Sequence, residues 1–403
     1  MKPFARFAAG FSLIASAAGA WAVPVPTYSV TQLKAVADPT AVPAPPSAWS
    51  PISFHAGAMN GAGQVVGYTR DLRGPSTAAT LWQNGDATNL GRFSNITGDP
   101  YSQAQAVAIN DAGDIVVNVL STSGYEVVVL RNGAATVFDG VASAINNQGV
   151  VAGHSSTWRA TIWSGSQVIE LGTAGGSQSS VAALSDTGIA VGVSGIQGDP
   201  TYQCMEWPGA ARCVVGHAMV WSASGVATDL GVLDGLASHA TGVNDLGQVV
   251  GAIHYGEGRP SGSFLWDGTS MTDMGVANLV DINNHGVIVG STRSSNGRSR
   301  ASVWFDGVEH DLTSLVEDDQ FGWVLSSSLD INDAGQILAS GLDNVGGWAV
   351  FVLTPMGVAN ELPEPAPLAL LSAGLLALMG QRGGARKAFS WTLARHTSAP
   401  SMK

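Results

Sequence analysis

The chain has 403 residues, and 45% of them are hydrophobic, so it can bury a sizeable core. Only 12% of the residues are charged, while 51 glycines predict many tight turns and few long helices. The net charge of −12 argues against a nucleic-acid-binding protein, because phosphate binding requires clustered lysine and arginine.

Residues 1–22 have the pattern of a secretory signal peptide. A basic amino-terminal region precedes an apolar stretch, and Ala20 and Ala22 form a small-x-small cleavage site that would leave Val23 as the new amino terminus. The alternative is a retained membrane anchor, which is disfavoured because the apolar run is short for a span. The sequence therefore predicts export.

The region of residues 23–354 repeats one block seven times. Each block has an apolar residue, Asn, a second Asn or Asp, any residue, Gly, and then a β-branched run. The copies are Met59–Gly63, Ile109–Gly113, Ile145–Gly149, Leu184–Gly188, Val243–Gly247, Ile282–Gly286 and Ile331–Gly335. Asn and Asp cap turns with their own side chains, and Gly tolerates the left-handed position. A calcium loop would need carboxylates at alternate positions and a bidentate Glu, so we expect hairpin turns instead.

A second block follows each turn. An apolar strand ends in Trp or a substitute, a Gly-containing turn follows, and a further strand ends at Leu or Met. The residues at the Trp position are Trp82, Leu130, Trp163, Trp221, Trp266, Trp304 and Phe351. We expect these large side chains to pack between repeats rather than to form a sugar-binding row.

These paired blocks resemble the HAF extracellular repeat. His217–Trp221 with Thr228–Gly231 is the nearest copy, and Ser263–Trp266 with Thr272–Gly275 comes next. The resemblance covers roughly residues 28–353. It implies an exported repeat protein, and it carries over no catalytic residue.

The repeats predict an all-β fold, a seven-bladed β-propeller closed by an N-terminal strand. Each repeat offers four short strands in about 45 residues, which is the size of one blade. The last repeat ends at Trp348–Leu353 without a fourth strand, and Tyr28–Leu33 fits that vacancy. The Pro-rich residues 37–51 would then be a crossing loop. An open β-solenoid is the alternative, but turn spacings of 36 to 59 residues suit blades with variable loops better.

Cys204 and Cys213 lie in the longest spacing between turns. Outside the cytoplasm, such a pair is expected to form a loop-stapling disulfide. The alternative, a redox-active dithiol, usually has a closer spacing and a lowered thiol pKa.

The carboxyl-terminal part, after a linker at 355–361, carries a second membrane signal. A Pro-Glu-Pro motif precedes an apolar run, and a basic cluster follows the run. The motif and the cluster consist of Pro363, Glu364, Pro365, Arg382, Arg386 and Lys387. Basic residues behind an apolar run keep that end cytoplasmic, so the segment would act as a tail anchor.

This order of parts resembles the PEP-CTERM sorting signal of exported Gram-negative proteins, here at residues 362–387. The resemblance implies processing at the inner membrane by an exosortase, in bacteria that make exopolysaccharide. The chain continues beyond the basic cluster through residues 388–403, whereas the family usually stops there. An ordinary tail-anchored helix is the alternative interpretation.

No motif in the sequence indicates catalysis, a cofactor or a metal. The eight histidines are scattered without metal-ligand spacing, and no glycine-rich stretch ends as a phosphate loop does. Asp318 and Asp319 are paired carboxylates, but adjacent residues of a strand point to opposite faces. We therefore expect no catalytic, cofactor-binding or metal-binding residue.

The sequence thus predicts an exported, non-catalytic repeat protein of the cell surface or exopolysaccharide matrix. Its expected partners are an exosortase, extracellular polysaccharide or surface proteins, and transiently the inner membrane, with no nucleic acid. The alternative is a propeller enzyme, a lyase or hydrolase of extracellular glycans, whose acid and base groups meet only in three dimensions. A channel lined by His, Tyr and carboxylates would favour the enzyme, and one lined by Ser, Thr, Ala and Gly the binding protein.

Overall fold

The computed structural model describes residues 25–35, 52–71, 77–196, 204–207, 210–213, 216–256, 259–294, 297–317, 322–342 and 347–356. The predicted signal peptide, sorting signal and carboxyl-terminal extension lie outside these ranges, as do the Pro-rich segment 37–51 and the Asp318–Asp319 pair. Within the ranges, none of the helices has the length and apolar character that a membrane span requires.

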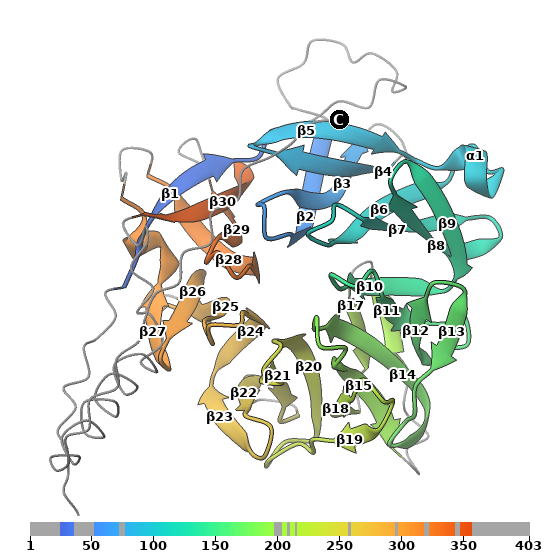
Figure 1. Ribbon diagram of the computed structural model, residues 1–403. Coiled ribbons are helices and arrows are strands. Elements are labelled where there is room, and N and C mark those ends of the chain that lie inside the picture. The colour runs from blue at the N-terminus through green and yellow to red at the C-terminus, as the bar shows by residue number, and fades with distance from the viewer. Residues whose placement is uncertain are drawn as a thin grey trace, which may run out of the picture. The chain divides into compact units, whose positions relative to one another are not determined.

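Seven four-stranded antiparallel sheets surround a central channel, so the chain is a seven-bladed β-propeller (Figure 1). From the channel outward, the first blade is β2 (Ile52–Met59), β3 (Val65–Asp71), β4 (Thr77–Gln83) and β5 (Asp86–Gly91). The second is β6 (Gln103–Ile109), β7 (Ile115–Ser121), β8 (Gly124–Arg131) and β9 (Ala134–Asp139). The third is β10 (Val141–Ile145), β11 (Val151–His154), β12 (Ala160–Ser164) and β13 (Gln167–Glu170). The fourth is β14 (Gly175–Leu184), β15 (Ala190–Ile196), β18 (His217–Trp221) and β19 (Ala227–Asp229).

The remaining blades follow in chain order. The fifth is β20 (Ala237–Val243), β21 (Val249–His254), β22 (Gly262–Trp266) and β23 (Met271–Gly275). The sixth is β24 (Ala277–Ile282), β25 (Ile288–Arg293), β26 (Ser299–Phe305) and β27 (Val308–Asp311). The seventh is β28 (Val324–Ile331), β29 (Ile337–Leu342), β30 (Trp348–Met356) and β1 (Thr27–Gln32). Two short helices, α1 (Ser94–Thr97) and η1 (Leu312–Leu315), lie in connections between blades.

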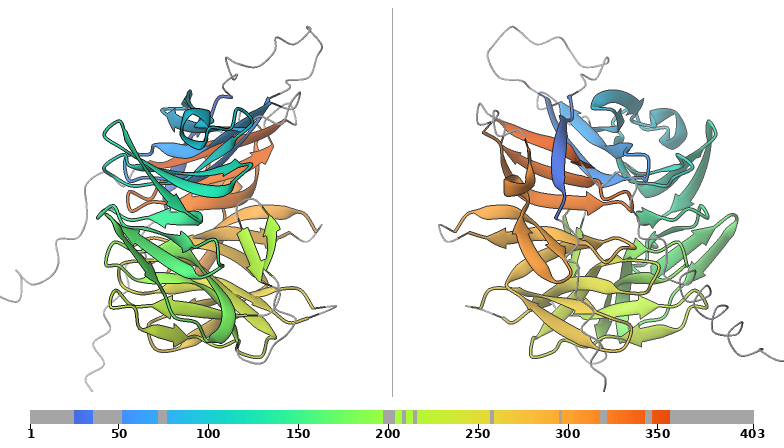
Figure 2. Two further views of the ribbon diagram at one scale, coloured as in Figure 1. Left: turned by 90° about the vertical axis from the view of Figure 1, so that its right-hand side faces the viewer. Right: turned by 60° about the vertical axis from the view of Figure 1, so that its left-hand side comes forward.

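The amino-terminal strand closes the ring, as the count of repeats predicts. β1 pairs antiparallel with β30, from Thr27 opposite Met356 to Gln32 opposite Phe351. The right-hand view of Figure 2 shows β1, in blue, along the orange-red strands of the last blade. The ring is therefore sealed between the two ends of the repeat region, and the open solenoid is excluded.

The tryptophans pack between neighbouring blades, which confirms the packing interpretation. The Trp82 side chain is fully buried with Leu338 and Val350 of the last blade, and its Nε1 donates to the Lys34 carbonyl at 2.7 Å. Trp221 of the fourth blade is likewise buried against the third. In a blade that has Trp at this position, the indole thus fills the space toward the preceding blade.

In five of the seven blades a glycine ends the β-branched run, and it has a packing reason. A Cβ atom at Gly67 would overlap the carbonyl of His55 on the neighbouring inner strand. The same overlap with inner-strand carbonyls would occur at Gly153 and Gly251. Only glycine permits this close approach of backbones without displacing the inner strand.

The two cysteines lie on a hairpin inserted in the fourth blade. Its strands, β16 (Cys204–Trp207) and β17 (Ala210–Cys213), pair so that the backbones of Cys204 and Cys213 are directly opposite. Opposed residues of antiparallel strands have Cα atoms about 4.5–5.5 Å apart, within the range that a disulfide requires. The disulfide itself remains a prediction.

Replacing Tyr28 tests the closing strand. Its side chain is 1% exposed in the core that the last two blades share, so Tyr28→Ala should lower the free energy of unfolding by about 3–5 kcal/mol. Gln32→Ala, on an exposed position of the same strand, should change it by less than about 0.5 kcal/mol. Urea unfolding of the three proteins measures both values, and equal midpoints would contradict this role of β1.

Candidate functional site

The central channel contains a cavity of about 410 Å³. Its wall is formed by the last residues of the seven inner strands and by the Asn-containing turns that follow them. Every inner strand has a β-bulge just before its turn, and the bulged residues line the cavity. These residues are Gly57, Val107, Ser143, Ala182, Thr241, Val280 and Leu329. Their types are mostly small or aliphatic.

Six of the seven turns are held by their own Asn, as predicted. In the first blade, Gln64 donates its main-chain N–H to Asn60 Oδ1 at 2.9 Å, and Gly63 donates to the Asn60 carbonyl at 3.0 Å. Gly63 has a φ of 74°, the left-handed value that favours glycine. In the fourth blade, Ser185 replaces Asn and accepts the equivalent N–H of Ile189 with its Oγ. The turns are structural hairpin turns.

The same asparagines also join the blades into a ring. The Nδ2 of each donates to the main-chain carbonyl of the corresponding residue in the next blade, at 3.0–3.2 Å. We call the seven residues the first belt: Asn60, Asn110, Asn146, Ser185, Asn244, Asn283 and Asn332. The bond from Asn332 to Asn60 closes the ring. Among the described contacts, only the step from Ser185 to Asn244 has no such bond, since the Ser185 hydroxyl instead contacts Thr187.

The next position of each turn forms a second belt. The main-chain N–H donates to Oδ1 of the corresponding residue in the following blade, at 2.7–2.8 Å. Its members are Gly61, Asp111, Asn147, Asp186, Asp245, Asn284 and Asp333. Asn147 and Asn284 also bridge the carboxylates on both sides with Nδ2. This belt is interrupted at Gly61, which has no side chain to accept from Asp333.

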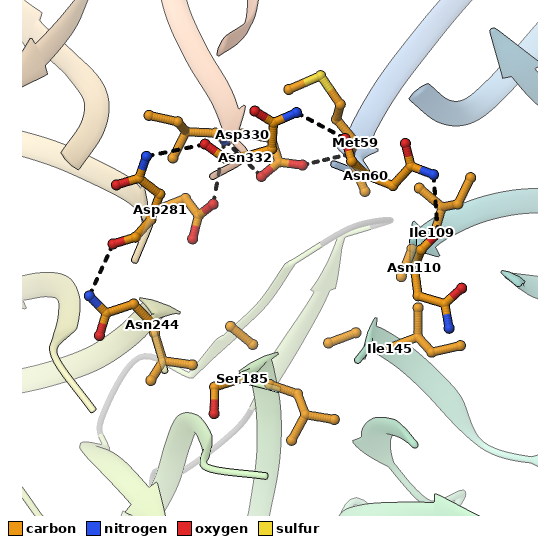
Figure 3. A pocket seen from close by; sticks show the side chains of 18 of the residues that line it. Met59, Asn60, Ile109, Asn110, Ile145, Ser185, Asn244, Asp281, Asp330 and Asn332 are labelled. Atoms are coloured by element: carbon orange, nitrogen blue, oxygen red, sulfur yellow. Dashed lines mark hydrogen bonds between the residues drawn. The ribbon is translucent and has the colours of Figure 1, made fainter. Parts of the chain in front are cut away.

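Two aspartates face each other in the wall of the cavity (Figure 3). Asp281 and Asp330, on the inner strands of the sixth and seventh blades, share a side-chain hydrogen bond. Asp330 Oδ2 accepts from the Met59 N–H of the first blade at 2.6 Å, and its Oδ1 accepts from the Ile331 N–H at 2.8 Å. The pair therefore links three blades.

The surroundings raise the pKa of both carboxyls. Desolvation by the enclosing protein is the main cause for each, although both side chains keep some access to the cavity. The charge of Asp281 and its hydrogen bond raise the pKa of Asp330 further, well above the usual range. Such a pair titrates as a unit that holds one proton between two carboxyls.

Sequence reasoning missed this pair, although the repeats contain a signal for it. Both aspartates stand directly before the apolar residue of the turn block. At the same position the other blades have Ala58, Ala108, Ala144, Ala183 and Gly242. An acidic residue in a position otherwise given to Ala or Gly marks a departure from the structural repeat.

The described residues that line the cavity include no His, Tyr, Lys or Arg. The histidines lie elsewhere: His154 stacks on Trp158, His239 stacks on His254, and His217 Nδ1 contacts Asp229 at 2.8 Å. In the part of the chain that the structure describes, no three His, Cys, Asp or Glu side chains are grouped to hold a metal. The channel wall thus combines small residues and Asn with one carboxyl pair.

The opposite end of the propeller presents exposed apolar side chains. We call this end of the propeller the loop face. The inner strand of each blade begins there, and the second strand of each blade ends there. Val324, Leu342 and Trp348 lie side by side there on three strands of the last blade, and Trp348 is 63% exposed. Tyr101 and Leu236, just before the inner strands of the second and fifth blades, are also exposed on this face.

Comparison with known proteins gives no family assignment. No family model and no curated protein matches the chain. A crystal structure of TolB from Acinetobacter baumannii aligns with a TM-score of 0.40 and 12% identity over 72% of this chain, which spans 63% of the TolB chain. A gluconolactonase from Xanthomonas campestris aligns with a TM-score of 0.36 and 12% identity, covering 64% of this chain and 90% of that one. At these scores, neither similarity indicates a function.

Two substitutions of Asn110 separate its two roles. Asn110→Ala removes the cap on Asp114 N–H and the bond to the Asn146 carbonyl, so we expect a loss of about 2–3 kcal/mol in the free energy of unfolding. Asn110→Ser should keep the cap, as Ser185 does, and lose only the cross-blade bond, at about 1 kcal/mol. Chemical unfolding measures both, and equal losses would show that the cross-blade bond alone matters.

Proposed function

We propose that this protein is an exported, non-catalytic interaction module of the cell surface or exopolysaccharide matrix. The observation that carries the proposal is the use of the polar side chains around the channel. The two belts engage the Asn and Asp side chains there in bonds between blades. These groups support the ring, which leaves the outer faces for recognition.

The loop face is the surface that we propose for binding. Trp348, Leu342 and Val324 form an exposed apolar group on adjacent strands. Exposed aromatic side chains bind apolar faces of sugar rings and protein surfaces alike, because they give large contact area at small entropic cost. Extracellular polysaccharide and other surface proteins are the partners that fit this chemistry.

The glycan-enzyme alternative is less well supported. Glycosidases place their two carboxyl groups about 5 Å or more apart to leave room for the scissile bond or a water. The carboxyls of Asp281 and Asp330 instead share a hydrogen bond, and both oxygens of Asp330 accept main-chain N–H groups. The pair is therefore arranged as a structural contact.

Sorting by an exosortase completes the proposal, and it is supported by the sequence pattern at residues 362–387. Intact-mass measurement of the native protein should show the loss of residues 1–22 and of the region after Glu364. A variant with Ala at Pro363, Glu364 and Pro365 should keep its carboxyl-terminal mass and remain at the inner membrane. Recovery of the full-length mass from the cell surface would contradict double processing.

The loop face can be tested for binding with a matched pair of variants. Trp348→Ala should weaken binding to exopolysaccharide purified from the producing bacterium by about tenfold or more, as expected for an exposed aromatic anchor. Leu246→Ala is the control, because Leu246 is 71% exposed in a turn on the opposite face. Isothermal titration measures both affinities. Equal weakening by the two changes would exclude a specific role for the loop face, whereas absence of binding by the parent protein would direct the search to surface proteins.

A further inference from the structure

The contact between the last and first blades differs from the other six. The chain passes from β1 of the last blade to β2 of the first blade at this contact, and the second belt is interrupted there at Gly61. The Asp330 carboxyl supplies a side-chain bond at this seam by accepting the Met59 N–H at 2.6 Å. The first-belt bond from Asn332 to the Asn60 carbonyl lies beside it.

The Asp330 carboxyl is itself oriented by Asp281. The two side chains meet in a hydrogen bond, which requires that one of them keep its proton. Asp281 Oδ2 also accepts the Ile331 N–H at 3.4 Å, so the sixth blade is tied to the same point. Loss of the shared proton would leave two negative carboxylates in contact.

Among the described residues of the cavity wall, no positive group offsets that repulsion. Asp333 follows β28 and its charge raises the pKa of Asp281, and Asp245 follows β20. β2 contributes Gly57, Ala58 and Met59 to the cavity wall, and β20 contributes Thr241 and Val243, none of which titrates. Across the cavity lie Asp111 and Asp186, and the described lining contains no basic residue.

We propose that Asp281 and Asp330 form a proton-dependent clasp at the contact between the last and first blades of the propeller. With the proton in place, the clasp joins the sixth, seventh and first blades. When the proton is released, the two carboxylates repel each other and the seam loosens. The contribution of this clasp to stability is therefore largest in acid and is lost as the pH rises.

The direction of the pH effect follows from proton linkage. The folded protein holds the proton at pH values where the unfolded chain, with ordinary carboxyl pKa values, has released it. The stabilisation is complete below the ordinary carboxyl pKa and is lost progressively as the pH rises through the folded-state pKa. Over this interval one proton changes the folding equilibrium constant tenfold per pH unit.

The test is the pH dependence of unfolding of the full chain between pH 4 and pH 9. In the parent protein, the folding equilibrium constant should fall as the pH rises. Asp330→Asn imitates the protonated side chain. The folding equilibrium constant of this variant should therefore fall less steeply than that of the parent, by a factor of about ten per pH unit. Asp306→Asn is the matched control. Asp306 is an exposed turn residue with a φ of 50°, and Asn84 and Asn132 have the same left-handed conformation in the corresponding turns of other blades, so this position accepts Asn. The control should follow the parent.

Amide hydrogen exchange locates the effect. After correction for intrinsic rates, protection in β2 and β28 should decrease between pH 6 and pH 9 in the parent and remain in Asp330→Asn, while β6 and β10 stay protected. If Asp330→Asn does not fold, Asp281→Asn serves the same purpose. Identical pH dependence in the parent and the Asn variant, or an equal loss of protection at every seam, would overturn the proposal.

Discussion

The hydrogen bond from an Asn carboxamide to a carbonyl of the next blade is the interaction on which this propeller depends. Asn carries an acceptor and a donor on one short side chain, so Oδ1 can hold its own turn while Nδ2 reaches across the seam. Asp has no donor for this second bond. Ser185 shows that a hydroxyl keeps the turn, but in the described structure it makes no bond to the next blade. The local turn and the ring are thus specified by the same atoms.

The interruptions of the two belts fall at different seams. Where Ser185 ends the first belt, Asp245 Oδ1 accepts two N–H groups, from Asp186 and Thr187. Where Gly61 ends the second belt, the first-belt bond from Asn332 persists. Every seam described by the structure therefore retains at least one bond between turns. Because the first-belt residues are buried, losing their bonds at one seam would leave polar atoms unpaired at a high cost in free energy.

The parts of the fold that depend on local chemistry could be predicted from the sequence. The turns, the four strands of each repeat and the vacancy beside the last blade all follow from residue order, and the structure confirms the closing strand. The acceptor of each Asn Nδ2 could not be predicted, because it lies 36 to 50 residues away, or 272 for Asn332, and its place depends on blade packing. The Asp281–Asp330 pair was missed for the same reason. Adjacency in the sequence draws attention to Asp318 and Asp319, whereas the paired carboxyls come from separate repeats.

The position of β1 has a consequence for the order of folding. Ser29 contacts a residue 325 positions later in the chain, so the first strand to be synthesised has to wait for almost the entire repeat region. Contacts of such high sequence separation form slowly, because the chain loses much conformational entropy before they are made. Blades built from neighbouring strands can assemble earlier from local contacts. Until β1 arrives, β30 offers an unpaired edge to any other extended chain, so the interval before closure is when this protein is most prone to aggregate.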